Sequence, residues 1–318
     1  MHHRLGYVSL TVAGVSLAVA SAIAQAPAPR SVPRTPWGDP DLQGLWTNAT
    51  VTPFERPANL SGKAVLTQEE AAEFERQTNQ ARDADNRGGG TEADLGRAYN
   101  QFWFERGTKV VGTRRTSLVT DPPDGRVPAL TPAAQSRADA RAEARRRSPA
   151  DGPEDRSLVE RCIVWPTAGP PMVPGAYNNN YQILQAPGHV AILIEMIHDV
   201  RIIPLDGRPH APQAIRQWMG DSRGRWDGNT LIVTTTNFTD KTIFRGSSAN
   251  LKIVERFTRV DPDTLDYQFS IDDPESFTRS WTAAVPMTKT DGPIFEYACH
   301  EGNYGMTNLL KGARAEDK

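Results

Sequence analysis

Two motifs that lie far apart in the sequence carry the side chains best suited to chemistry. The first is His198-Asp199-x-Arg201, and the second is Cys299-His300-Glu301-x-Asn303-Tyr304. Both stand among runs that are typical of apolar β-strands, where an unpaired polar group is costly. The two motifs therefore predict a satisfied polar network, a metal site or a substrate site.

Acid–base catalysis of a lyase, isomerase or hydrolase type is one chemistry that these residues could perform. Either His198 or His300 would move the proton, because an imidazole titrates near neutral pH. A neighbouring carboxylate would orient that histidine, and Arg201 would neutralise anionic charge on the substrate. The predicted catalytic residues are His198, Asp199, Arg201, His300 and Glu301. The predicted ligand-binding residues are Tyr177, Tyr181, Trp218, Asn303 and Tyr304.

Three other interpretations use the same residues. A ligand-binding or carrier protein would hold a small organic molecule in the polar pocket without converting it. A metal-dependent enzyme would use some of the side chains as ligands, and a structural network would only fix the strand register. The sequence contains neither HExxH nor CxxC, so it implies no particular metal or cofactor. The side chains that zinc or iron would accept are His198, Asp199, His210, His300 and Glu301.

The two cysteines of the chain are Cys162 and Cys299. In an exported protein such a pair most simply forms a disulfide, which would tie the loop that enters the predicted barrel to its last strand. The alternative is a nucleophile pair formed by Cys299 and His300. Neighbouring residues of a strand point to opposite faces, so His300 could not easily activate Cys299.

An aromatic and amide-rich loop precedes the first strand of the C-terminal half. It contains Gly169-Pro170-Pro171-Met172 and Tyr177-Asn178-Asn179-Asn180-Tyr181. Such a loop could line the mouth of a pocket for sugars or aromatic compounds, or it could be a stiff turn held by Asx hydrogen bonds. Trp218 and Trp226 are either core residues or pocket walls.

Alternating apolar residues predict the strands that position these groups. Val190, Ile192, Ile194 and Met196 share one face, which His198 joins if the strand runs unbroken. Residues 226–230 predict a tight hairpin, and strands at 251–260 and 265–271 flank a turn at 261–263. Leu265, Tyr267, Phe269 and Ile271 form a continuous apolar face, and alternation returns at Phe277, Arg279 and Trp281.

Consecutive strands joined by short turns predict an antiparallel meander, and closing it into a barrel would remove its exposed edges. The expected fold class is therefore mainly β, a β-barrel-like domain of lipocalin or calycin type with an N-terminal helical elaboration. Thr67 and Glu70 form a capping box that begins a helix from residue 68 to about residue 82. Thr131 and Pro132 begin a second helix that runs to Arg147.

Two charged or flexible segments accompany these helices. The run Arg145-Arg146-Arg147 is either a solvated helix face or a docking surface for an acidic partner. Residues 83–90 contain three consecutive glycines and predict a mobile loop. The formal net charge of −2 argues against a nucleic-acid-binding protein.

The N-terminal residues predict export. Arg4 precedes an apolar run from Val8 to Ala24 that ends in small residues, as in a cleaved secretory signal peptide of residues 1–26. The expected destination is the periplasm or the outside of the cell, with no stable membrane span after cleavage. The remaining chain is expected to comprise a flexible leader (27–35), an N-terminal strand with helices (36–160), a β-barrel-like domain (161–312) and a tail (313–318).

Several segments resemble those of a family of exported bacterial proteins. The resemblance covers nearly all of the chain after the predicted signal peptide. It implies export and a single-family architecture, and it carries no activity or catalytic residue. Gly44-Leu45-Trp46 also resembles the GxW motif of the first lipocalin strand, whereas the long helical segment that follows departs from the compact lipocalin pattern. The family segments are PWGDPDLQGLW (36–46), SLVTDPPDGRVP (117–128), HDVRIIPLDGRPH (198–210), QWMGDSRGRWDGNTLIV (217–233), VERFTRVDPDTL (254–265) and FEYACHEGNYGM (295–306).

Overall fold

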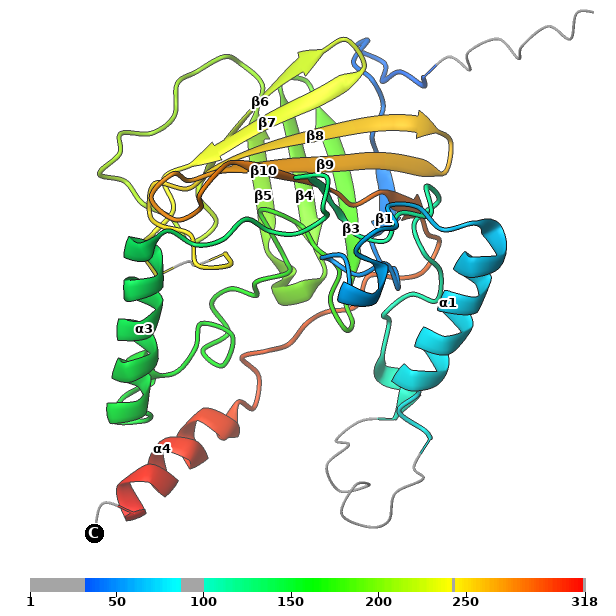
Figure 1. Ribbon diagram of the computed structural model, residues 1–318. Coiled ribbons are helices and arrows are strands. Elements are labelled where there is room, and N and C mark those ends of the chain that lie inside the picture. The colour runs from blue at the N-terminus through cyan, green and yellow to red at the C-terminus, as the bar shows by residue number, and fades with distance from the viewer. Residues whose placement is uncertain (1–31, 87–99, 242–243, 317–318) are drawn as a thin grey trace, which may run out of the picture. The chain divides into compact units, whose positions relative to one another are not determined.

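An antiparallel sheet dominates the computed structural model, which describes residues 32–86, 100–241 and 244–316 (Figure 1). Nine strands follow one another in the order β5-β4-β3-β1-β11-β9-β8-β7-β6, and β10 with β2 extends the sheet beside β9. The strands are β1 (Gly44–Thr47), β2 (Val119–Asp121), β3 (Asn180–Ala186), β4 (His189–Ile194), β5 (Val200–Pro204), β6 (Asp221–Asp227), β7 (Thr230–Thr236), β8 (Lys252–Asp261), β9 (Thr264–Asp272), β10 (Trp281–Ala284) and β11 (Met287–Lys289).

The two end strands, β5 and β6, approach each other and nearly close the sheet into a barrel. Gly224 of β6 permits the approach, because a Cβ atom there would lie 2.6 Å from Leu205 Cδ2 and 2.8 Å from Ile203 Cγ2. Arg201 of β5 also donates a hydrogen bond of 3.4 Å to Ser222 Oγ of β6. The predicted barrel-like fold is thus confirmed, and side chains join its two end strands.

Short turns set the order of the later strands, as the sequence predicts. Gly228 and Asn229 alone connect β6 to β7, and Gly228 has the positive φ of 58° that a two-residue hairpin needs. β8 and β9 pair around Asp261 and Thr264. By contrast, β1 lies between β3 and β11, so the first strand of the chain pairs with the last.

The inward face of the barrel is packed with large side chains. Leu265, Tyr267, Phe269 and Ile271 of β9 are all fully buried, which confirms the predicted apolar face. Burying one such side chain contributes about 1.5–3 kcal/mol to stability. The barrel interior is therefore the hydrophobic core of the protein. The largest fully buried side chains include Trp46, Tyr181, Phe257, Tyr267, Phe269 and Trp281.

Two helices begin where the sequence predicts them, and a third, α4 (Tyr304–Glu316), was not predicted. α1 (Gln68–Arg82) starts with a complete capping box, in which Thr67 Oγ1 accepts from Glu70 N and Glu70 Oε2 accepts from Thr67 N. α3 (Pro132–Arg147) starts with Thr131 as N-cap. α4 follows the last strand, and short 3-10 turns occupy η1 (Ala58–Leu60), η2 (Gln101–Trp103), η3 (Pro153–Asp155) and η4 (Met196–His198). Among the described residues, no helix is long and apolar enough to cross a bilayer.

The predicted strand through Val190 ends earlier than continuous alternation implies. β4 stops at Ile194, and the left-handed backbone at Ile197 (φ 68°) and His198 (φ 50°) turns the chain back into β5. His198 is consequently exposed and does not share the inward face. Phe277 precedes β10 and lies outside the named strands, where it forms an isolated bridge to Leu130. The predicted signal peptide, most of the leader and the glycines of the 83–90 loop lie outside the described residues.

Candidate functional site

Arg201 lies inside the barrel, where it forms an ion pair with Glu255 of β8. Its Nη1 and Nη2 atoms lie 3.0 Å and 2.5 Å from the two carboxylate oxygens, and the two side chains are 3 % and 0 % exposed. Tyr267 donates its hydroxyl to Glu255 at 2.9 Å, and Ser222 pairs with Thr235 at 2.9 Å. Burial would lower the pKa of Arg201, but the Glu255 carboxylate outweighs it and holds that pKa above its usual value. Arg201 therefore belongs to a buried network in the core.

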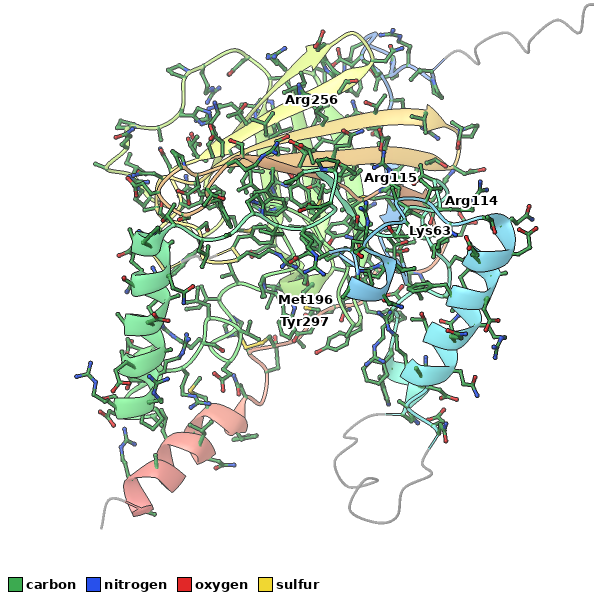
Figure 2. All side chains as sticks on the ribbon, in the orientation of Figure 1. Lys63, Arg114, Arg115, Met196, Arg256 and Tyr297 are labelled. Carbon is green, nitrogen blue, oxygen red and sulfur yellow. A yellow bond between two sulfur atoms is a disulfide. The ribbon has the colours of Figure 1, made fainter. Side chains whose placement is uncertain are left out.

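His198 lies apart from Arg201, at the turn between β4 and β5. Its Nδ1 atom is 2.9 Å from the carbonyl oxygen of Tyr297, so η4 contacts the segment that leads to the Cys299 motif. Figure 2 labels Met196 and Tyr297 at this contact. Burial raises the pKa of Asp199, and the neighbouring His198 offsets part of this increase. The structure thus brings His198 to the C-terminal segment and separates it from the buried Arg201.

Glu195, which precedes η4, is buried and forms a hydrogen bond with the same C-terminal segment. Its Oε1 accepts from the backbone N–H of Phe295 at 3.0 Å, and its Oε2 accepts from Asn180 Nδ2 at 2.9 Å. The same amide nitrogen donates to Glu105 at 3.0 Å. Burial raises the pKa of Glu195, and the nearby Glu105 carboxylate raises it further. The sequence offered no sign of this carboxyl group, because its partners come from three separate segments.

The raised pKa of Glu195 has a defined effect on stability. The native state binds this proton more tightly than the unfolded chain, so its contribution is present below the ordinary value of 4.5 and is lost as pH rises through the raised pKa. The Glu195→Gln variant should therefore lose less melting temperature than the wild type between pH 4.5 and pH 7. Thermal unfolding across that range measures the difference. The variant Glu301→Gln, at an exposed carboxyl, should follow the wild type, and parallel profiles for Glu195→Gln would contradict the assignment.

The predicted disulfide between Cys162 and Cys299 is confirmed. Their Cα atoms lie 5.7 Å apart across a sequence separation of 137. The bond occupies both thiols, so Cys299 has no free thiolate to act as a nucleophile with His300. Near it, His300 and Glu301 are exposed, and Tyr304 is 74 % exposed at the start of α4. Asn303 donates its side-chain amide to the carbonyl of Glu160 at 3.4 Å, so it ties this motif to the segment around Cys162.

The other three aromatic candidates lie in different surroundings. Tyr181 is buried in the core, where its hydroxyl accepts from Asn48 Nδ2 at 3.2 Å, and burial raises its pKa. Tyr177 packs against Trp165, with ring centroids 6.2 Å apart. Trp218 is partly exposed and lines two surface hollows. Among the described residues, no group of three or more histidines, cysteines and acidic residues could hold a metal ion.

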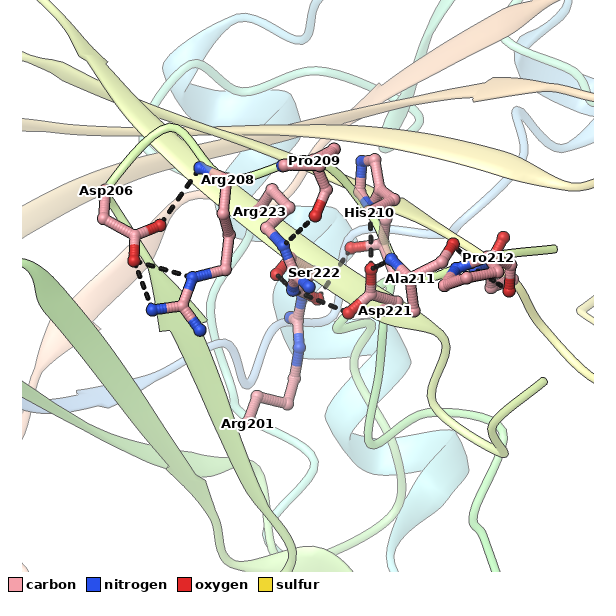
Figure 3. Close-up of polar contacts among 12 residues, drawn as sticks. Arg201, Asp206, Arg208, Pro209, His210, Ala211, Pro212, Asp221, Ser222 and Arg223 are labelled. Carbon is pink, nitrogen blue, oxygen red and sulfur yellow. Dashed lines mark hydrogen bonds and ion pairs between the residues drawn. The ribbon is translucent and has the colours of Figure 1, made fainter. Parts of the chain in front are cut away.

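His210 belongs to a cluster at the start of β6 (Figure 3). Its Nδ1 atom lies 2.9 Å from Asp221, and the same carboxylate accepts from Ala211 N and from Arg223 at 2.6 Å. Arg223 also donates to the carbonyl of Pro209. The sequence indicated His210 only as a potential metal ligand. The structure uses it to fasten the loop before β6 to the sheet.

The larger hollow has a volume of about 910 Å³ and lies beside α3. Its walls come from α3, from the segment 154–170, and from residues that flank β6 and follow β7. Cavities of a few hundred to about a thousand Å³ are typical of small-molecule sites. The apolar part of the lining comprises Ala144, Leu158, Val159, Val164, Pro166, Trp165, Trp218 and Phe244.

Cations outnumber carboxylates in this lining. The cations are Arg141, Arg145, Arg147, Arg156, Arg161 and Lys241, and the carboxylates are Glu154, Asp155 and Asp240. Arg161 lies 3.7 Å from Glu154, and Arg156 donates to Glu160 and to the carbonyl of Pro149. The Nε atom of Arg156 is buried and has no partner.

Arg141 and Arg145 form the most distinctive part of the lining. With Arg137 they repeat every four residues, which places the three on one face of α3. Like charges at this spacing repel each other and destabilise a helix by about 0.2–0.5 kcal/mol per pair. Burial lowers the pKa of Arg141, and Arg137 lowers it further, which Asp240 partly offsets. Arg137 is bonded to Ser276, whereas Arg141 and Arg145 have no hydrogen-bond partner among the described residues.

The spacing of Arg137, Arg141 and Arg145 was available in the sequence, but the opposite wall was not. That wall is formed by Leu158, Trp165 and Trp218, which no local pattern connects to α3. No family model matches the chain, and neither a curated protein nor a solved structure is detectably similar to it.

Proposed function

We propose that this protein is an exported binding protein for small organic anions, which it holds in the hollow beside α3. The carrying observation is the pair Arg141 and Arg145, two guanidinium groups without hydrogen-bond partners in the described chain that face a cavity of about 910 Å³. A carboxylate bound there would accept their hydrogen bonds and remove their mutual repulsion. Trp165, Trp218 and Phe244 would cover the apolar part of the ligand.

Binding without conversion is the activity that this lining supports best. The described lining contains no histidine. Of its acidic residues, Glu154 lies 3.7 Å from Arg161, Asp155 accepts from the backbone N–H of Gly152, and Asp240 lies near Arg141. The acid–base candidates His198 and His300 lie on other segments, and Arg201 is occupied by Glu255. A reaction in this hollow would therefore lack a histidine for proton transfer and would have to use a carboxylate or Lys241 instead.

The disulfide supports the exported part of the proposal. Disulfides persist in oxidising compartments such as the periplasm and the extracellular space. The predicted signal peptide of residues 1–26 and the resemblance to exported bacterial proteins favour the same compartments. The ligand would accordingly be an organic anion available outside the cytoplasm.

Calorimetry with matched pairs of ligands tests the proposal. Benzoate should bind more tightly than benzamide, and galacturonate more tightly than galactose, because only the acids carry a negative charge that strengthens the hydrogen bonds from the two arginines. Such bonds contribute about 1.5–3 kcal/mol each. The Arg141→Ala/Arg145→Ala variant should therefore bind the acids at least about tenfold more weakly. Higher ionic strength should weaken binding to the wild type.

Arg146 provides the matched control for this experiment. It lies on the same helix turn but pairs with Glu143 at 2.6 Å and does not line the hollow. Arg146→Ala should leave the affinities unchanged. Equal affinity for acids and neutral analogues, or an equal loss in Arg146→Ala, would refute anion binding in this hollow. Conversion of a bound acid to a product, followed by mass spectrometry, would show that the protein is an enzyme.

A further inference from the structure

A second, smaller hollow adjoins the first. It has a volume of about 440 Å³ and is lined by Arg216, Trp218, Thr239, Asp240, Lys241 and Ala249. Trp218, Asp240 and Lys241 line both hollows. The two hollows are therefore neighbours that share one wall, and Trp218 is its aromatic part.

Arg216 gives the smaller hollow a cation that is already held in place. Its Nη1 atom donates to the carbonyl oxygens of Phe238 at 3.4 Å and Ala249 at 2.5 Å. The backbone of the next residue, Gln217, also bonds to Asn237 and Thr239. The remaining guanidinium nitrogens of Arg216 have no hydrogen-bond partner among the described residues. An arginine fixed by one nitrogen loses little further freedom when its other nitrogens bind an anion.

Each hollow thus has its own arginines, and the two linings share an aromatic side chain. Arg141 and Arg145 line the larger hollow, Arg216 lines the smaller one, and Trp218 lines both. A ligand that filled both hollows would pass over Trp218 and present an anionic group on each side of it. A ring with an apolar face is suited to the contact with the indole.

The carboxylates of the lining favour a ligand that carries hydroxyl groups as well as anionic groups. Glu154, Asp155 and Asp240 are hydrogen-bond acceptors that a ligand with only anionic and apolar groups, such as benzoate, would leave unused. They are accommodated if the ligand also carries hydroxyl groups, because a carboxylate accepts hydrogen bonds from hydroxyls. Ser148, Ser157 and Thr239 add further polar groups to the two linings.

We infer that the two hollows together bind an oligomer of an acidic sugar, with one carboxylate and several hydroxyls on each ring. This inference rests on the proposed binding of organic anions and names the ligand class. One sugar unit would occupy the larger hollow against Arg141 and Arg145. The chain would then cross Trp218, and a further unit would place its carboxylate against Arg216.

The dependence of affinity on chain length tests this inference. The probes are galacturonate and its linear dimer, trimer and tetramer, titrated into the full oxidised protein. The affinity should rise at least tenfold from the monomer to an oligomer long enough to reach the smaller hollow. Neutral galactose oligomers of the same lengths should show no such gain. An equal gain for the neutral oligomers would overturn the inference, because the carboxylates would then be irrelevant.

Two variants test whether the increase in affinity with chain length depends on the smaller hollow. Arg216→Gln removes its cation, and Ala249→Leu fills part of its volume while leaving Arg216 in place. Both should reduce the affinity for the tetramer to near that for the monomer, while the affinity for the monomer stays within about twofold of the wild type. Ala249→Leu keeps the test valid if Arg216→Gln lowers the melting temperature. A gain from chain length that survives in folded Ala249→Leu protein would overturn the inference.

The remaining outcomes separate this inference from the proposed function. If galacturonate binds through Arg141 and Arg145 but longer oligomers bind no more tightly, the inference fails and anion binding stands. The same holds if benzoate binds and no galacturonate does. If no organic anion binds at all, both fail together.

Discussion

Replacing Glu255 with leucine should lower the free energy of unfolding by about 3–5 kcal/mol, which is the usual cost of leaving one partner of a buried ion pair behind. Arg201 would then remain in the core with no counter-charge, since its side chain is 3 % exposed and both terminal nitrogens bond to Glu255. Tyr267 would lose its acceptor as well. Urea unfolding, followed by circular dichroism, measures the change.

The double variant Arg201→Met/Glu255→Leu provides the control for this prediction. Two apolar side chains of similar length leave no charge in the core, so most of the lost stability should return. The double variant should therefore be clearly more stable than Glu255→Leu alone. A double variant as unstable as the sum of the two single variants would show that the network does more than neutralise buried charge.

Removing the disulfide should also lower the free energy of unfolding by a large amount. The bond closes a loop of 137 residues, for which the chain-entropy model gives about 5 kcal/mol, and losses of about 2–5 kcal/mol are typical in small exported domains. Denaturant unfolding of Cys162→Ala/Cys299→Ala measures it. A reductant should destabilise the wild type and leave this variant unchanged, and equal stability with and without reductant in the wild type would contradict the prediction.

Removing the disulfide should also weaken ligand binding in the larger hollow. Cys162 lies between Arg161 and Val164, which both line the larger hollow, and Trp165 of that wall packs against Tyr297 near Cys299. Without the bond, the ring contact between Trp165 and Tyr297 and the hydrogen bond from Asn303 to Glu160 would still join this wall to the C-terminal segment. The affinity for an organic anion should consequently fall in the cysteine-free variant even where the protein remains folded.

Local patterns predicted the parts of the fold whose determinants are close together in the sequence. Thr67 and Glu70 are three residues apart, and the hairpin at Gly228 depends on two turn residues. The alternation from Leu265 to Ile271 required only that one face be buried. Each of these patterns depends on residues that are close together in the sequence, so the sequence alone was sufficient to predict the corresponding element.

Long-range contacts account for what the sequence did not predict. Arg201 and Glu255 are 54 residues apart, and nothing near either one identifies the other. The left-handed turn at Ile197 and His198 includes a β-branched residue, which rarely adopts this conformation, so continuous alternation pointed to the wrong position for His198. The hollow beside α3 draws on four separate segments, of which only the arginine spacing on α3 was visible.

The side-chain closure between β5 and β6 also determines where the folded protein opens first. Ladder hydrogen bonds protect backbone amides from exchange with solvent, and the β7–β8–β9 strands have such ladders along both edges of β8. The facing edges of β5 and β6 are joined by Arg201, Ser222 and packing around Gly224 instead. Amide protons there are therefore exposed by small local fluctuations, while those of β8 exchange only when the whole domain unfolds.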